Sequence, residues 1–118
     1  MKRIESFLVA KEDTLFNVFK LKSMSRPNDS LAILMYGSPD PDAIASAMAL
    51  QEMMRQMVGI ANCVIASTET ALRQQNIEFM RAMKINVQLL SKIDLQEYRL
   101  IAVVDAQPTF FGKALENI

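Results

Sequence analysis

Three short apolar segments constrain the fold of this chain more than any other feature. They are residues 31–35, the centre of Asn62–Ser67, and Leu100–Val104, and none of them alternates apolar with polar residues. Strands buried on both faces, as in parallel sheets, have this character, whereas half-exposed strands alternate. The three segments therefore predict strands of a parallel sheet.

The segments between these strands have helical periodicity, and Gly59 stands where a first helix of about 16 residues would stop. Residues 85–90 form either a short strand or an irregular piece. The order strand, helix, strand, helix, strand predicts an α/β fold, a three-layer, Rossmann-like parallel sheet flanked by helices and joined by right-handed crossovers. The apolar residues of the two helical patterns are Ala43, Ala47, Leu50, Met54 and Met57, and then Leu72, Phe79, Met80 and Met83.

The first 28 residues are predicted to be a separate helical segment. Turn-forming residues at 25–30 break its pattern and connect it to the α/β part, which spans residues 29–118. Its apolar residues recur at spacings of three and four, at Ile4, Phe7, Leu8, Leu15, Val18 and Phe19.

The composition excludes several classes of function. The chain has 118 residues, 51% of them hydrophobic, and its 13 basic and 13 acidic residues balance, so no global field attracts nucleic acid or a membrane surface. The absence of histidine excludes a Ser-His-Asp triad and zinc sites built on imidazole. With one cysteine, Cys63, and no apolar stretch near 20 residues, no intrachain disulfide or membrane insertion is expected, and a cytoplasmic location is the default.

Three aspartates are predicted to meet at one edge of the sheet. Asp40 and Asp42 follow the first apolar strand, and Asp105 follows the last. Ligands of parallel α/β sheets bind outside the carboxyl ends of the strands, and carboxylate oxygens suit Mg²⁺ or Mn²⁺. Asp40 and Asp42 also suit an N-cap and a first helical turn around Pro41. From spacing alone, a shared metal site and simple helix capping both stay open.

Ser38 and Ser46 are weaker candidates for binding substrate. A hydroxyl near a helix start more often bonds the local backbone than a ligand. Neither serine is expected to be a nucleophile, because no general base of the usual kind is present.

The segment Ser38-Pro-Asp-Pro-Asp-Ala-Ile-Ala-Ser-Ala47 resembles the first motif of the DHH phosphoesterase superfamily, which includes RecJ-like exonucleases, nanoRNA and pAp phosphatases, and family II pyrophosphatases. Val103-Val-Asp-Ala-Gln-Pro108 resembles the second motif, a strand that ends in aspartate. The resemblance implies that Asp40, Asp42 and Asp105 are catalytic metal ligands. It also implies that a pair of Mn²⁺ or Mg²⁺ ions activates water and holds phosphoryl oxygens.

The chain departs from the family pattern in several places. Tyr36 stands where the family has a histidine, Ser38 replaces an asparagine, and Ala45 replaces a glycine. The Asp-His-His motif, the fourth aspartate motif and the carboxy-terminal substrate domain are not among these residues. Residues 29–118 are therefore interpreted as the amino-terminal part of a DHH domain.

The resemblance implies a metal-dependent phosphoesterase that acts on short oligonucleotides or small nucleotide phosphates, with this segment inactive alone. The alternative is a degenerate DHH-like regulatory module that binds a nucleotide without hydrolysing it. Because a partial α/β sheet exposes an edge or an apolar face, self-association is also expected.

Overall fold

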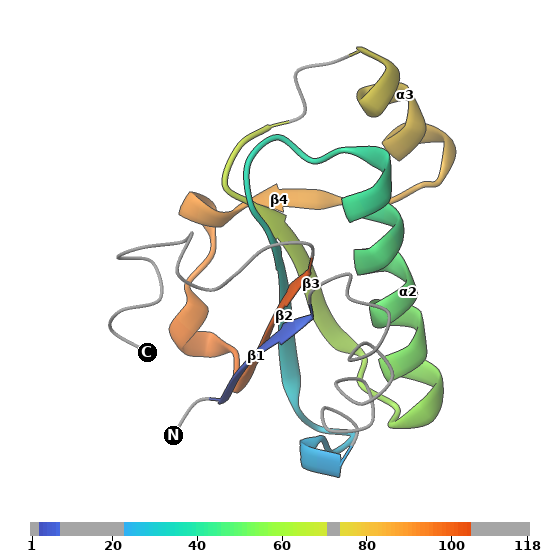
Figure 1. Cartoon of the computed structure of the whole chain (residues 1–118). Helices are drawn as coiled ribbons and strands as arrows, with labels where there is room; N and C mark the ends of the chain where they lie inside the picture. The colour runs from blue at the N-terminus through green and yellow to red at the C-terminus, as the bar shows by residue number, and fades with distance from the viewer. Residues whose placement is uncertain (1–2, 8–22, 71–73, 105–118) are drawn as a thin grey trace.

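The computed structural model describes residues 3–7, 23–70 and 74–104 of the chain. The described elements form a five-stranded, all-parallel sheet in the order β1-β5-β2-β3-β4 (Figure 1). Their bounds are β1 Arg3–Phe7, β2 Ser30–Met35, α2 Pro41–Met57, β3 Asn62–Ser67, α3 Gln74–Ala82, β4 Val87–Leu89, the 3₁₀ helices η1 Leu90–Lys92 and η2 Leu95–Glu97, and β5 Leu100–Val104.

The predicted central strands are confirmed, and so is the α/β class. The first apolar segment forms β2, and the other two form β3 and β5 with the bounds that the sequence predicted. All five residues of β5 are buried, as expected for a strand covered on both faces. Of residues 85–90, only Val87–Leu89 are strand, so the predicted short strand exists as the edge strand β4.

The prediction of helix at the start of the chain is wrong for Arg3–Phe7. These residues form strand β1, which pairs with β5 in parallel, with Arg3 beside Leu100 and Phe7 beside Val104. A spacing of three and four among few apolar residues is too short a pattern to distinguish a helix from an edge strand. Residues 8–22, with the rest of that pattern, lie outside the described residues.

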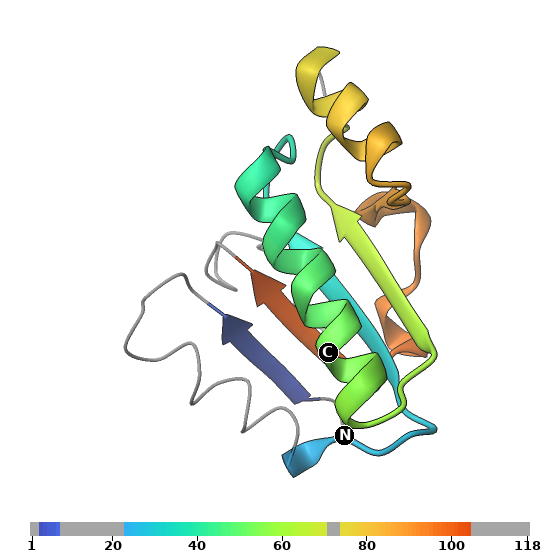
Figure 2. The same cartoon turned by 90° about the vertical axis from the view of Figure 1, so that its right-hand side faces the viewer.

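Crossover handedness explains which face each connection covers. The steps from β2 to β3 and from β3 to β4 run in the same direction across the sheet, so right-handed crossovers put α2 and α3 on the same side (Figure 2). Buried residues of α2, including Ile44 and Met54, pack there against the strands, and Phe79 and Met80 of α3 join the same cluster.

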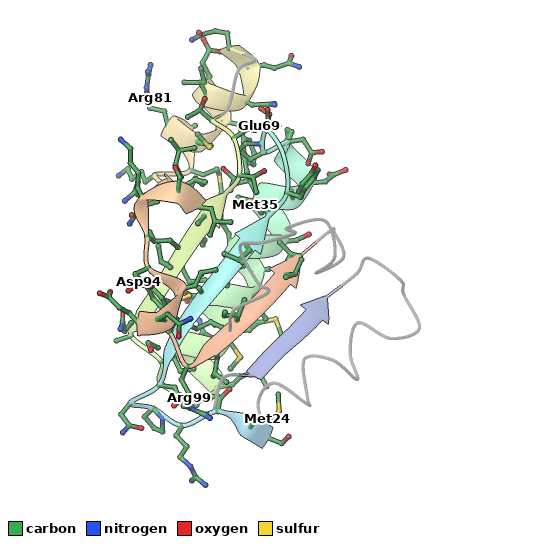
Figure 3. All side chains as sticks on the ribbon, turned by 90° about the vertical axis from the view of Figure 1, so that its left-hand side faces the viewer. Met24, Met35, Glu69, Arg81, Asp94 and Arg99 are labelled. Atoms are coloured by element: carbon green, nitrogen blue, oxygen red, sulfur yellow. The ribbon has the colours of Figure 1, made fainter. Side chains whose placement is uncertain are left out.

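The opposite face of the sheet is covered differently from the prediction. The connection from β4 back to β5 crosses this face, and its side chains Leu90, Ile93, Leu95 and Tyr98 pack on a second cluster (Figure 3). Within the described residues this layer consists of the short helices η1 and η2 and contains no α-helix. The described part of the chain also contains no helix long and apolar enough to cross a membrane.

The helix α2 ends where the sequence predicts. Gly59 has φ +89°, a conformation that glycine adopts without the steric cost of a Cβ atom. The amides of Val58, Gly59 and Ile60 all donate to the carbonyl of Met54, at 3.1 to 3.3 Å. These bonds satisfy the end of the helix and turn the chain toward β3.

A charged pair joins the amino ends of β2 and β5. Nε and Nη2 of Arg99 donate to the two carboxylate oxygens of Asp29, at 2.6 and 2.7 Å, and Nη2 also donates to the Met24 carbonyl. The amide of Arg26 donates to Asp29 as well. Asp29 is buried, and the hydrogen bond from Arg99 is the main cause of the lowered pKa of its carboxyl group.

We expect Asp29→Asn to destabilise the fold at neutral pH. The free energy of unfolding of this variant should also fall less between neutral and acid pH. A carboxyl group whose pKa is lowered by folding contributes stability above its unfolded pKa, near 3.9, and loses it as the pH falls through the lower folded value. At pH 7 the free energy of unfolding should fall by about 1–2 kcal/mol. Solvent screens the Coulombic part of the Asp29–Arg99 interaction, because the Arg99 side chain is 43% exposed.

Urea denaturation at pH 7 and at pH 3 checks this expectation, with Glu52→Gln as the control. Glu52 pairs with Arg55 on the exposed surface of α2, so its replacement should matter less. Equal losses from the two substitutions would contradict a structural role for the Asp29–Arg99 pair.

Candidate functional site at the carboxyl edge of the sheet

Strands β2 and β5 are direct neighbours although about seventy residues separate their sequences. They run in parallel, with Leu31 beside Leu100 and Leu34 beside Val103. Their carboxyl ends therefore reach the same edge of the sheet. Asp40 and Asp42 follow β2 in the chain, and Asp105 directly follows the last residue of β5.

Asp40 caps helix α2. Its Oδ1 accepts a hydrogen bond from the Ala43 amide at 2.8 Å, and Pro41 occupies the first turn. The capping role that the sequence allowed is thus confirmed. Capping occupies one carboxylate oxygen of Asp40, and the residue itself is exposed. The same carboxylate can therefore cap the helix with one oxygen and bind a metal ion with the other.

Asp42 lies exposed in the first turn of α2, where its charge favours the positive end of the helix dipole. Ser46, one turn later, donates from its hydroxyl to the Asp42 carbonyl at 2.9 Å. This is the local backbone bond expected of a serine near a helix start. Ser38 is half-buried in the loop between β2 and α2.

The start of the loop after β2 is bonded to the end of β3. Gly37 has φ +79°, and its amide donates to Oγ1 of Thr68 at 2.6 Å. The Thr68 amide donates in turn to the Met35 carbonyl at 3.2 Å. Thr68 therefore links the carboxyl ends of β2 and β3 through both its side chain and its backbone.

Glu69 brings a further carboxylate to this edge. A Cβ atom placed on Gly37 would lie 3.5 Å from Oε2 of Glu69. Ser67, 2% exposed, donates from its hydroxyl to the Glu69 carbonyl at 2.6 Å. Figure 3 shows Glu69 just beyond the carboxyl end of β2, past Met35, whereas Asp94 lies away from this edge on the connection that covers the second face.

Asn76 of α3 holds the same loop from the other side. Its side chain is buried, and Nδ2 donates to the Pro39 carbonyl at 3.2 Å. A polar side chain at this depth needs such a partner, because an unpaired buried amide is costly. The bond ties α3 to the residue directly before Asp40.

We expect Asn76→Ala to cost about 1–2 kcal/mol of the free energy of unfolding, because it leaves the Pro39 carbonyl without this donor. The matched control is Gln75→Ala, which changes an exposed side chain on the same helix. Urea denaturation checks the difference, and the same loss in both variants would contradict a role for Asn76 in holding the loop.

The predicted site residues are only partly described. Asp40 and Asp42 lie at the expected edge, and Asp105 lies outside the described residues. Within residues 3–7, 23–70 and 74–104, no group of three or more His, Cys, Asp or Glu side chains is arranged to hold a metal ion. The donors that the chain offers at this edge are carboxylates and hydroxyls, a set that fits Mg²⁺ or Mn²⁺ and not a soft metal.

Two other side chains bear on the chemistry of the chain. Tyr36 follows β2 directly and is 55% exposed, which is high for an aromatic residue. The thiol of Cys63 is half-buried on β3, and burial raises its pKa to about 11. At neutral pH this thiol is protonated, which argues against Cys63 as a nucleophile.

Sequence reasoning missed the three residues that hold or approach the loop, Thr68, Glu69 and Asn76. A signal existed for the first two, because polar residues that follow a buried strand reach the edge where ligands bind. Asn76 carried no such signal. Its role depends on where α3 packs.

Protein-family models, curated proteins and solved structures were all compared with the chain, and none of them matches it. Function must therefore be inferred from the fold and from the carboxyl edge of its sheet.

Proposed function

We propose that this chain is the amino-terminal part of a metal-dependent phosphoesterase of the DHH type that acts on short oligonucleotides or small nucleotide phosphates. The observation that carries the proposal is the pairing of β2 with β5 in parallel. Aspartates follow both β2 and β5 in the sequence, and these two strands are neighbours. The segments that resemble the first and second DHH motifs therefore begin at the same edge of the sheet.

In this proposal Asp40, Asp42 and Asp105 hold one or two Mg²⁺ or Mn²⁺ ions. The ions would supply a Lewis acid for phosphoryl oxygens and a lowered pKa for bound water. They would also attract an anionic substrate, which the balanced charge of the chain does not do by itself.

The residues of the chain have separate tasks. Asp40 offers one carboxylate oxygen while the other caps α2, and the exposed Asp42 offers its whole carboxylate. The amino end of α2, a 17-residue helix, adds a partial positive charge that favours a phosphate group nearby. Thr68 and Asn76 keep the loop between β2 and α2 in place through the bonds to Gly37 and Pro39.

The test is hydrolysis by a longer chain that carries this segment together with an Asp-His-His motif. Such a protein should release product from at least one of pAp, short RNA, a cyclic dinucleotide or pyrophosphate, and only with Mn²⁺ or Mg²⁺ present. If none of the four is hydrolysed with either ion, the phosphoesterase proposal is wrong.

One observation favours a second candidate, a regulatory module that binds a nucleotide without hydrolysing it. Tyr36 stands where the DHH pattern has a histidine, and an exposed phenol is a poor substitute for an imidazole ligand. Metal-dependent binding of a nucleotide by the longer chain, with no hydrolysis of any substrate in the panel, would favour this candidate.

A further inference from the structure

A cleft of about 180 Å³ opens beside the loop that carries Asp40. Its walls come from the carboxyl end of β3 and Thr70 beyond it, from β4, from α3, and from Pro39 of the loop between β2 and α2. Figure 2 shows α3 extending past the carboxyl end of β3, so the helix overhangs this part of the edge. The cleft thus lies at the edge where parallel α/β sheets bind ligands.

The lining of the cleft is mostly apolar, with three polar residues, Ser67, Thr70 and Gln88. Ile77, Met80, Val87 and Leu89 are half-buried in its walls, and Gln88 is exposed. None of its described lining residues carries a charge. Among these residues a phosphate group would find no counter-charge, whereas an uncharged group with apolar faces and a hydrogen-bonding edge fits them.

The cleft and the proposed metal site share one piece of backbone. Pro39 lines the cleft and directly precedes Asp40, and the bond from Asn76 holds its carbonyl in place. A ligand that occupies both places must have an anionic part at the aspartates and a neutral, partly apolar part beside Pro39. Among the four compounds of the hydrolysis test, the nucleotides have both parts, whereas pyrophosphate has only the first.

We propose that this cleft binds the nucleobase of a nucleotide whose phosphate lies at Asp40 and Asp42. This inference rests on the proposed function and assigns the place in the fold where the base of its nucleotide substrate binds. In the cleft the base lies against Met80 and Val87, and the exposed amide of Gln88 bonds the edge of the base.

The test separates the base from the phosphate. Amide chemical shifts of the 118-residue chain are followed by NMR during titration with adenosine, with ribose 5-phosphate and with AMP, each with and without Mg²⁺. Adenosine, which has no phosphate, should shift Ile77, Val87 and Gln88 whether or not Mg²⁺ is present. Ribose 5-phosphate should shift the amides of Asp40 and of residues 42–44 only with Mg²⁺. AMP with Mg²⁺ should bind at least about tenfold more tightly than ribose 5-phosphate, because it uses both places.

Two substitutions in the cleft check the assignment. Gln88→Ala changes an exposed residue of the edge strand, and it should weaken adenosine binding about three- to tenfold, the effect of one hydrogen bond. Ile77→Glu places a carboxylate in the wall of the cleft and should weaken adenosine binding further. Gln75→Ala, on α3 but not among the residues that line the cleft, is the control, and all three variants should bind ribose 5-phosphate as the unchanged chain does.

The two proposals fail in different ways. If adenosine shifts no residue of the cleft, or binds Gln88→Ala and Ile77→Glu as well as the unchanged chain, the nucleobase site is wrong, even when ribose 5-phosphate binds with Mg²⁺. If ribose 5-phosphate and Mg²⁺ leave the amides of Asp40 and of residues 42–44 unaffected, the metal-dependent phosphate site is wrong, and the adenosine titration still decides the cleft.

Discussion

If the proposed phosphoesterase function holds, replacing Asp42 by alanine in a chain that hydrolyses the substrate should lower metal-dependent hydrolysis at least about 100-fold, because a lost ligand removes both metal affinity and charge stabilisation in the transition state. Asp42 is a cleaner probe than Asp40. Asp40 also caps α2, so its replacement costs about 1 kcal/mol of stability in addition to any effect on the site. Asp42 is exposed, so its replacement should affect the stability of the fold only through the loss of a favourable charge at the helix start.

The control for Asp42→Ala is Asp94→Ala. Asp94 caps a short helix as well, since its Oδ1 accepts from the Gln96 amide at 3.0 Å, but it lies away from the edge at which Glu69 lies (Figure 3). Its replacement should leave the rate of hydrolysis within about twofold of the unchanged protein, because it touches neither substrate nor metal in this account. Similar rates for both variants would contradict the assignment of Asp42.

The second large effect concerns stability. Ile44→Ala should lower the free energy of unfolding by about 2–4 kcal/mol, because Ile44 is fully buried between α2 and the sheet. Alanine is the better helix former, so the loss reports packing and not helix propensity. The same helix carries Asp40 as its cap and Asp42 in its first turn, so the packing of Ile44 also places the candidate site.

The matched control is Met57→Ala, at the end of the same helix. Met57 is 39% exposed, and its replacement should change the free energy of unfolding by no more than about 0.5 kcal/mol. Urea denaturation at pH 7 measures both variants. A loss from Ile44→Ala no larger than that from Met57→Ala would contradict the packing of α2 on the sheet.

The central strands could be predicted from sequence because burial on both faces leaves a local pattern. The centre of β3 and the whole of β5 are apolar without alternation, and turn or polar residues bound them. The start of α2 could be predicted for the same kind of reason, since Asp40 and Pro41 form a capping pair that needs no tertiary contact. The end of α2 at Gly59 follows from the left-handed conformation that glycine allows.

Other features have no local pattern. Strand β1 exists because its backbone pairs with β5, nearly a hundred residues later in the chain, and its few apolar residues match a helix as well. The Asn76–Pro39 bond and the approach of Glu69 to Gly37 join segments that are distant in sequence. The strand order, which brings β5 beside β2, also depends on long-range pairing, and the aspartates alone did not determine it.

The proposed metal site requires Asp42 and Asp105 to bind the same metal ion or ion pair. Mn²⁺ binding to the 118-residue chain can be measured by isothermal calorimetry for the unchanged chain and for Asp42→Asn, Asp105→Asn, the double variant and the control Asp94→Asn. Each single substitution at the site should weaken Mn²⁺ binding at least about tenfold, the double variant should bind Mn²⁺ hardly more weakly than either single variant, and Asp94→Asn should have no effect. Unchanged Mn²⁺ affinity in Asp42→Asn or in Asp105→Asn would contradict the proposed metal site.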